Sequence, residues 1–151
     1  MYPPGSAGDG HTVHWAPPEH GILIWGPDGA LVAYVGLVVR AGSLDGVPVT
    51  IGGVGSVKTH PGLEGRGYAS AGLRHAATVL TGDHAVAFSL LVCRDGLLAF
   101  YERLGWRAFS GRLLVEQPAG RVEFTLNRPM VLPGRRAAPG GGVIDLHGPP
   151  W

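Results

Sequence analysis

The pattern of apolar and polar positions predicts a meander of strands in the first third of the chain. Gly21–Trp25, Ala30–Arg40 and Val47–Thr59 are short runs rich in β-branched and aromatic residues, which is typical of strands. Gly26-Pro27-Asp28-Gly29 separates the first two runs and carries a hairpin signal. Ala41–Gly46 predicts a second turn before the longest strand.

The middle of the chain changes to a helical period and then to a buried strand. Gly65–Leu80 begins with small residues and continues with apolar positions three and four apart, which predicts a helix. Ala85–Val92 is a continuous apolar run, as expected of a strand covered on both faces. Asp95 is a candidate N-cap for a second helix over Gly96–Leu104, which Gly105 would end at the C′ position.

The remaining apolar runs predict short extended segments. Trp106–Phe109 and Val122–Leu132 are expected to be the last antiparallel strands, and Val143–Leu146 a short extended tail after the loop Arg135–Gly142. His11–Trp15 alternates polar and apolar residues and predicts a short strand. Together these elements predict a mixed α/β fold.

Length and composition restrict the class of protein. The 151 residues suit one domain, which we place at residues 11–151 after a Pro/Gly-rich flexible tail at 1–10. A net charge of +1 gives no signature of nucleic-acid binding, and the apolar runs are far shorter than a membrane span. The single cysteine, Cys93, excludes an intramolecular disulfide and suits a cytoplasmic protein.

The junction between the long strand and the first helix is the clearest candidate site. Gly52-Gly53 within the strand indicates a bulge or a close approach of another backbone. Small residues at Gly65–Ser70 then leave backbone N–H groups at the positive end of a helix dipole, which forms an anion site. The alternative is a tight turn that binds no ligand.

The loop Gly65-Arg66-Gly67-Tyr68-Ala69 resembles the diphosphate loop of the GNAT acyltransferases, [Q/R]-x-x-G-x-[G/A]. The resemblance implies a GNAT-like, mostly antiparallel sheet flanked by helices, and acetyl-CoA as the cofactor. Glu64 departs from the expected Gln or Arg, and a carboxylate about 8 Å from a phosphate costs roughly 0.5–2 kcal/mol. Arg66, or a Glu64 side chain turned away, would offset that cost. The cofactor-binding residues implied by the loop and the preceding strand are Val57, Thr59, Glu64, Gly65, Arg66, Gly67, Tyr68, Ala69 and Ser70.

Tyr101-Glu102-Arg103-Leu104-Gly105-Trp106 resembles the second signature of the family, Y-x-x-x-G-[F/W]. The resemblance implies that the Tyr101 hydroxyl faces the sulfur of CoA and protonates the departing thiolate. General-acid catalysis of this kind contributes about 10²–10⁴-fold. The alternative is that Tyr101 only packs the end of a helix against the sheet.

Two branches of this superfamily are the most similar, the aminoglycoside 2′-N-acetyltransferases and the nodulation-factor N-acyltransferases. The similarity lies in Trp15–Ile24, in HPGLEGRGYAS and in the terminal GGVIDLHGPPW. It implies a role in antibiotic resistance and an acceptor site for a small-molecule amine. Asp9 matches one acidic position that binds the polyamine there, His14 replaces another, and Trp151 matches a C-terminal tryptophan whose carboxylate reaches the acceptor. A frayed end at Trp151 is the alternative.

Three departures from the family leave alternatives open. Gly55, with Ser56 beside it, stands where a Glu general base is common, so that His60, His147, Asp145 or water would serve instead. Cys93 follows the buried strand near the expected acyl group, as a substrate contact or as a structural residue. The usual N-terminal strand and helices are shortened or missing, and the exposed strand edge this leaves favours a homodimer.

These observations support three hypotheses. The first is an acyl-CoA-dependent N-acyltransferase acting on an amine of a small molecule, with Tyr101 as catalytic acid and Gly55, Ser56, Cys93, Asp145 and Trp151 among the acceptor contacts. The second is a binding or regulatory subunit without turnover. The third keeps the scaffold for different chemistry on a carrier-bound or CoA-free substrate. The histidines form no compact ligand set, so no metal is expected.

Overall fold

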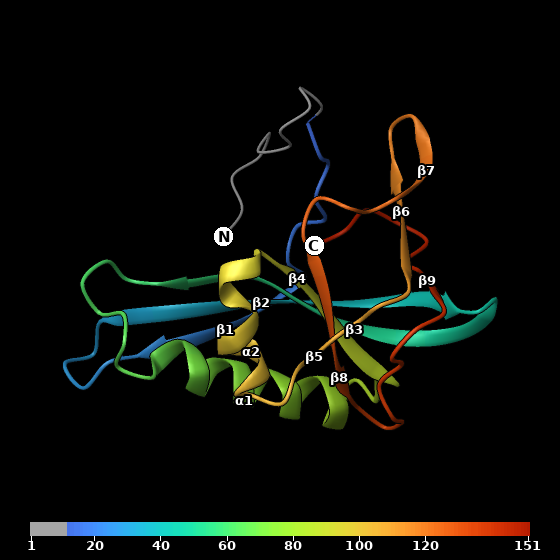
Figure 1. Cartoon of the computed structure of the whole chain (residues 1–151). Coiled ribbons are helices and arrows are strands. Elements are labelled where there is room, and N and C mark those ends of the chain that lie inside the picture. Colours follow the sequence, from blue (N-terminus) through green and yellow to red (C-terminus); the bar gives the residue numbers. More distant parts are fainter. Residues whose placement is uncertain (1–11) are drawn as a thin grey trace.

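The structure, a computed structural model, describes residues 12–151. The predicted tail and the proposed role of Asp9 lie outside the described residues. The elements are β1 His20–Trp25, β2 Leu31–Leu44, β3 Val47–Thr59, α1 Tyr68–Gly82, β4 Phe88–Cys93, the 3₁₀ turn η1 Asp95–Leu97, α2 Leu98–Glu102, β5 Arg107–Ala108, β6 Arg112–Gln117, β7 Gly120–Glu123, β8 Arg128–Pro133 and β9 Val143–Asp145 (Figure 1).

The strands form one sheet of nine in the order β5-β8-β4-β3-β2-β9-β6-β7, with β1 also paired to β2. The pairs β3–β4 and β6–β9 are parallel, and the other described pairs are antiparallel. The expected α/β fold with a mostly antiparallel sheet is therefore confirmed. Because β2 has 14 residues, one edge of it carries β1 along its first half and β9 at its end.

The two faces of the sheet are covered by different parts of the chain. Helix α1 lies along one face with α2 beside it, while β6, β7 and β9 rise on the opposite side (Figure 1). Leu73 of α1 packs there with Val35 and Trp106 in one apolar cluster. Leu113 of β6 and Trp151 belong to the other cluster, on the opposite face. Burial of both faces explains why all six residues of β4 are buried.

The second turn is shorter than the sequence pattern predicted. Strand β2 continues to Leu44, which pairs with Val47, so only Asp45 and Gly46 form the turn. Both have positive φ, 51° and 81°. The six-residue turn at Ala41–Gly46 was wrong because Asp-Gly suits a two-residue hairpin with left-handed geometry at both positions.

Predictions for the later elements were also wrong in part. The single strand Val122–Leu132 is divided, because β7 pairs with β6 whereas β8 pairs with β4 and β5. Strand β6 was missed altogether. The cap at Asp95 was also wrong: the residue preceding η1 is Arg94, without a side-chain cap, and Asp95 pairs with Arg128 at 3.3 Å.

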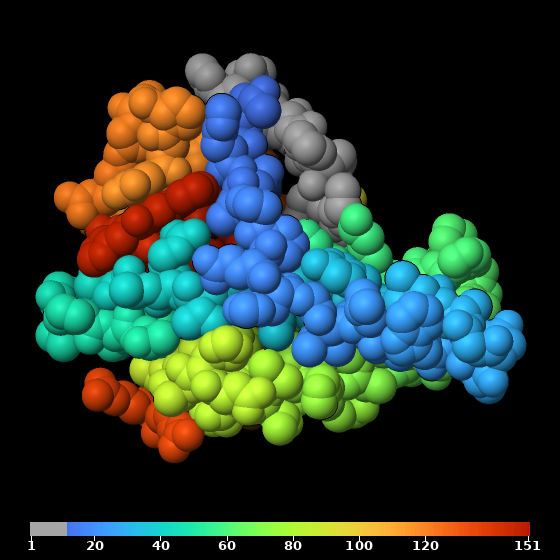
Figure 2. Space-filling model, turned by 180° about the vertical axis from the view of Figure 1, so that it is seen from behind, coloured from blue at the N-terminus to red at the C-terminus, as the bar shows by residue number. Residues whose placement is uncertain are grey.

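The N-terminal segment is not a strand where it is described, at residues 12–18. It runs beside the C-terminal segment and β6 (Figure 2). The Ala16 N–H donates to Pro150 O at 2.6 Å, and His14 exchanges two hydrogen bonds with the amide of Gln117. Trp15 meets Phe124 edge to face. Contacts with distant parts of the chain, not with a neighbouring strand, therefore fix this segment.

Candidate active site

A break in the pairing of β3 and β4 opens the centre of the sheet. The parallel pairing covers three residue pairs, from Ile51–Phe88 to Gly53–Leu90. Beyond it, β3 contains a bulge, since Ser56 and Val57 together face the single residue Val35 on β2. Ser56 has the left-handed φ of 51° that such a bulge can require. Beyond Gly53 and Leu90 neither strand pairs with the other, which leaves room between them.

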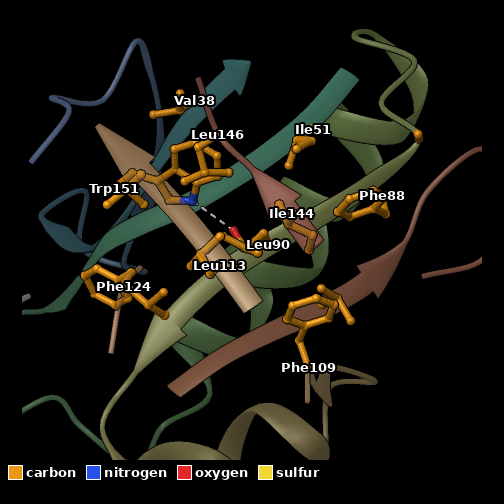
Figure 3. Packing of buried hydrophobic residues seen from close by; sticks show 14 residues of the cluster. Val38, Ile51, Phe88, Leu90, Phe109, Leu113, Phe124, Ile144, Leu146 and Trp151 are labelled. Atoms are coloured by element: carbon orange, nitrogen blue, oxygen red, sulfur yellow. Dashed lines mark hydrogen bonds between the residues drawn. The ribbon is translucent and has the colours of Figure 1, made fainter. Parts of the chain in front are cut away.

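The glycine pair in β3 marks a close approach, and the bulge lies further along the strand. A Cβ at Gly52 would lie 2.7 Å from Ser89 Oγ, and one at Gly53 would overlap the indole of Trp151, with Nε1 2.6 Å away. The indole N–H donates to Leu90 O at 2.9 Å (Figure 3). Trp151 thus contacts both β3 and β4 where they separate.

The space between the separated strands is a cavity of about 260 Å³, which we call the strand-split cavity. Tyr101 of α2 contributes to its wall and is itself 6% exposed. Its ring is held edge to face between Phe100 and Trp106, at centroid distances of 5.0 and 6.4 Å. The lining residues are Val54, Gly55, Ser56, Val57, Leu91, Val92, Arg94, Leu97, Phe100 and Tyr101.

A second cavity, of about 580 Å³, lies where α1 begins, and we call it the loop–helix cavity. Leu97 and Phe100 line both cavities, so the two adjoin at these side chains, and we call the pair of cavities the groove. The residues lining the second cavity are Thr59, Leu63, Glu64, Gly65, Gly67, Tyr68, Ala69, Ser70, Arg74, Leu97, Phe100, Arg103 and Leu104. The structure therefore brings most of the predicted cofactor residues into one groove with Tyr101.

The N-terminus of α1 has the geometry of an anion site. Gly65 and Gly67 have φ values of 79° and 83°, which glycine adopts without strain. The first helical hydrogen bond runs from Ala71 N–H to Gly67 O. The N–H groups of residues 68–70 precede it, at the positive end of the helix dipole, and the first turn carries no acidic residue. A diphosphate fits this end of the groove on charge and on backbone geometry.

Glu64 is turned toward its own loop. Its carboxylate accepts a hydrogen bond from the Gly62 N–H at 2.9 Å. Gly62 has a φ of 84°, so the loop curls tightly enough for this contact. The carboxylate thus has a local donor, and Glu64 nevertheless lines the loop–helix cavity.

Arg66 lies on the other side of this loop. It lines a separate open cavity of about 640 Å³ together with the β1–β2 turn, His60 and Tyr68, which we call the hairpin cavity. The His60 ring bonds the neighbouring Pro61 O at 3.0 Å. Neither Arg66 nor His60 is among the residues that line the groove. Within it, the arginines are instead Arg74, Arg94 and Arg103, of which the sequence had suggested none.

The Cys93 side chain does not reach the groove. It is fully buried and its Sγ lies 3.7 Å from Met130 Sδ. Burial raises the pKa of the thiol from 9.0 to about 11, against a lowering effect of Arg128 and with a raising effect of Asp95. The prediction of a substrate contact at Cys93 is therefore corrected to the structural alternative, because β4 directs this side chain into the core.

This burial predicts that Cys93 resists alkylation in the native protein. A pKa two units above the ordinary value lowers the thiolate fraction at pH 8 by about 100-fold, before any effect of access. Iodoacetamide labelling at pH 8, followed by mass spectrometry, is expected to be at least about 100-fold slower in buffer than in guanidinium chloride. Because the chain has one cysteine, the signal is unambiguous. Comparable rates in both solvents would contradict the placement.

Asp145 holds the C-terminal segment and lies away from the groove. It is buried, pairs with Arg121 at 2.6 Å and accepts the His147 N–H at 2.9 Å. Burial raises the pKa of its carboxyl, but the bonds from His147 and Arg121 prevail and keep the pKa below its ordinary value. His147 contacts Ser43 Oγ at 3.3 Å. Neither residue, nor His14, is among those lining the groove. The acceptor contacts predicted at His14 and Asp145, and the general base considered at His147 or Asp145, are therefore not brought together with Tyr101.

A side chain at position 55 would be crowded by Trp151. A Cβ on Gly55 would lie 3.2 Å from the carbonyl carbon of Trp151, which is tighter than ordinary van der Waals contact. The residues that line the strand-split cavity include no carboxylate and no imidazole. The described part of the site therefore offers Tyr101 as an acid and no side chain in reach as a base.

Residues 12–151 contain neither a cluster of metal ligands nor a helix that could span a membrane. No three His, Cys, Asp or Glu side chains in this part of the chain are grouped so that they could hold a metal ion. No helix in it is long and apolar enough to cross a membrane.

The fold and the groove define a class of protein: an acyltransferase-like sheet that splits beside a glycine-rich helix N-terminus. Residues 11–109, about two thirds of the chain, match the family model described as Acetyltransferase (GNAT) domain. The chain belongs to this family of N-acetyltransferases, for which acetyl-CoA is the typical cofactor. Membership of the GNAT family, which the two signatures predicted, is thus confirmed. The sequence matches no curated protein.

Solved structures agree in fold. A GNAT family N-acetyltransferase from Escherichia coli in complex with CoA, YhbS, has a TM-score of 0.59 at 15% identity, over 87% of this chain and 68% of that one. Bacillus subtilis YlbP, in complex with coenzyme A, has a TM-score of 0.52 at 15% identity, over 82% and 70%. The chain spans only 21% of a longer N-acetyltransferase from Kribbella flavida, at 23% identity, 58% coverage of this chain and a TM-score of 0.50.

Proposed function

We propose that this chain transfers an acetyl or other acyl group from acyl-CoA to an amine of a small molecule. The observation that carries the proposal is that the cavity at the start of α1 adjoins the cavity lined by Tyr101, with Leu97 and Phe100 in the wall of both. A donor bound along the groove would place its phosphates at the positive end of α1 and its reactive end in the strand-split cavity.

Each part of the groove has a separate task in this proposal. Bound acyl-CoA supplies the thioester. Ser56 and Val57 form the bulge of β3 and line the strand-split cavity, where the acyl group of the donor would lie. Tyr101 donates its phenolic proton to the leaving group, in a position fixed by Phe100 and Trp106. Holding the reactants together supplies roughly 7–11 kcal/mol of the barrier reduction.

The strand-split cavity is lined by no carboxylate or imidazole that could act as a general base, and this constrains the acceptor. An ammonium ion has no lone pair, so the amine must bind in its neutral form or lose its proton to water. Alignment of the reactants is worth more than the few kcal/mol that a general base supplies, so turnover without one is consistent with the family's chemistry.

An amino sugar or aminoglycoside is the acceptor class we favour, on the resemblance of Trp15–Ile24 and of the C-terminal stretch. Gly55 and Ser56 are the predicted acceptor contacts that line the strand-split cavity. Trp151 lies immediately behind Gly55 and limits the cavity on that side. A cytoplasmic location suits a reaction that consumes acyl-CoA.

Thermal shift and thiol release together test the function. A ligand at 100 times its dissociation constant stabilises the folded state by about 2.7 kcal/mol. We expect CoA and acetyl-CoA to raise the melting temperature, and acetyl-CoA with an amine panel that includes aminoglycosides to release free thiol. A rise in melting temperature without release of free thiol for any amine would favour the binding or regulatory subunit. The structural observation in favour of that alternative is the lack of a general base in the strand-split cavity. No shift would favour the altered-chemistry alternative and contradict the proposal.

We also propose a homodimer through the outer edge of β1. In the described residues this edge has no strand partner, and Leu23, Trp25 and Leu31 beside it are 50%, 59% and 43% exposed. Such an edge without charges or proline favours pairing with another strand. Light scattering at micromolar concentration is expected to give the mass of two chains. The mass of one chain would contradict the dimer and leave the acyltransferase proposal untouched.

A further inference from the structure

The floor of the strand-split cavity lies where β3 and β4 part. Their parallel pairing ends at Gly53 and Leu90. The indole N–H of Trp151 donates to Leu90 O at 2.9 Å (Figure 3), and a Cβ at Gly53 would overlap the same ring. Gly55, two residues on and therefore on the same face of β3, also lies against Trp151. The indole thus spans the last pair of residues and closes the split from behind.

The indole separates the strand-split cavity from the apolar cluster on the other face of the sheet. Tyr101 and Val54, which line the cavity, belong to the cluster on the α1 face, whereas Trp151 belongs to the opposite cluster. Because Gly53 and Gly55 have no side chains, β3 itself places nothing between the cavity and that second cluster. A chain that passes between the strands from Tyr101 toward the opposite face therefore meets the Trp151 ring.

Contacts on several sides hold the ring of Trp151 in this position. The Arg40 guanidinium carbon lies 5.2 Å from the ring centroid. Arg40 Nη1 also donates to Leu146 O and to Pro149 O, each at 3.2 Å, so the arginine fixes the segment that carries the ring. Trp151 is 6% exposed, and its surroundings are a packed apolar cluster. The indole is therefore a fixed wall, and turning it aside would break these contacts.

We infer that Trp151 is the residue that restricts the donor to short acyl groups such as acetyl and propionyl. This inference rests on the proposed function, since it assumes that the thioester end of acyl-CoA lies beside Tyr101. The strand-split cavity, of about 260 Å³, is smaller than the roughly 300–1,000 Å³ of pockets that enclose a drug-sized ligand, so it holds only the end of the donor. A longer acyl chain that continues between β3 and β4 has to displace the indole and its hydrogen bond to Leu90 O.

Calorimetric titration of acetyl-CoA, butanoyl-CoA and octanoyl-CoA tests this limit without an acceptor. We expect the unaltered protein to bind acetyl-CoA at least about 10-fold more tightly than either longer thioester, since one extra methylene in a closed pocket already costs this much. In Trp151→Leu the preference over octanoyl-CoA is expected to disappear, because each methylene that enters the vacated apolar space contributes up to about fourfold. Trp151→Phe keeps a smaller ring and is expected to admit butanoyl-CoA but not octanoyl-CoA.

Phe109→Leu is the matched control for a general loss of packing. Phe109 is a buried aromatic residue of the same apolar cluster as Trp151, lies apart from it (Figure 3) and lines neither cavity of the groove. The substitution is expected to lower the melting temperature and to leave the preference for acetyl-CoA at its original value. An equal change of preference in Phe109→Leu and Trp151→Leu would show that a loosened core admits long chains, and would overturn the inference.

The remaining outcomes separate this inference from the proposed function. Equal affinity of the unaltered protein for acetyl-CoA and octanoyl-CoA would overturn the inference alone, as would an unchanged preference in both Trp151 variants. Preferential binding of acetyl-CoA without thiol release for any amine would overturn the proposed transfer alone. Failure of CoA and of all three thioesters to bind would overturn both.

Discussion

Replacement of Trp151 by alanine is expected to lower the free energy of unfolding by about 3–5 kcal/mol, the range for a buried large aromatic side chain. The indole is 6% exposed and contacts both strands where the sheet splits. Its loss removes the hydrogen bond to Leu90 O and leaves the Arg40 guanidinium, now 5.2 Å from the ring centroid, without its aromatic partner. The cavity that the substitution leaves lies between β3 and β4. Part of the lost free energy of unfolding therefore comes from the van der Waals contacts that the surrounding side chains lose.

Chemical denaturation of the variant and of Val47→Ala measures this effect against a control. Val47 is 60% exposed on β3, away from the edge of β1, and its truncation is expected to cost under about 1 kcal/mol. Gly53→Ala tests the same contact from the strand side, because its Cβ would overlap the indole, and overpacking typically costs about 1–3 kcal/mol. A loss for Trp151→Ala no larger than that for Val47→Ala would show that the C-terminal segment does not stabilise the sheet.

Tyr101→Phe is expected to lower kcat by about 10²–10⁴-fold, the usual contribution of a general acid. The substitution removes only the phenolic oxygen and keeps the ring that packs against Phe100 and Trp106. Because α1 and its loop, not Tyr101, form the phosphate end of the groove, the dissociation constant of CoA is expected to stay within about twofold.

Steady-state kinetics with a thiol reagent, combined with calorimetry for CoA, separates the two quantities. Tyr34→Phe is the control, since Tyr34 packs over Gly21 and lines none of the three cavities. It is expected to leave kcat unchanged. A kcat of Tyr101→Phe within threefold of the original would contradict the general-acid role. Tyr101 would then have only the packing role that the sequence left open.

Local signals in the sequence determined the central elements and much of the candidate groove. The apolar run before Cys93 predicted a strand covered on both faces, and β4 is fully buried. Glycine before a helical period predicted the turn at residues 65–67 and the start of α1, because positive φ and free N–H groups are properties of the local backbone. Tyr101 was found in the same way, through a short signature with fixed spacing.

Other features depend on residues that are far apart in the chain. No local pattern predicted β6, and its register is set by pairing with β7 and with the parallel strand β9. The carboxylate of Asp95 accepts a hydrogen bond from Arg128, 33 residues away, and does not cap the helix that follows it. These errors share one cause, which is that pairing across the sheet prevails over local preference.

The sequence by itself determined the family, the order of the central elements and the loop that can receive phosphates, since each follows from backbone preferences over a few neighbouring residues. Tertiary structure alone decided that Trp151 fills the space beside Gly53 and Gly55 and that Cys93 faces the core. It also decided that Arg74 and Arg103 border one cavity. Those placements arise from contacts between segments that meet only when the two faces of the sheet are covered, and a linear pattern does not contain that information.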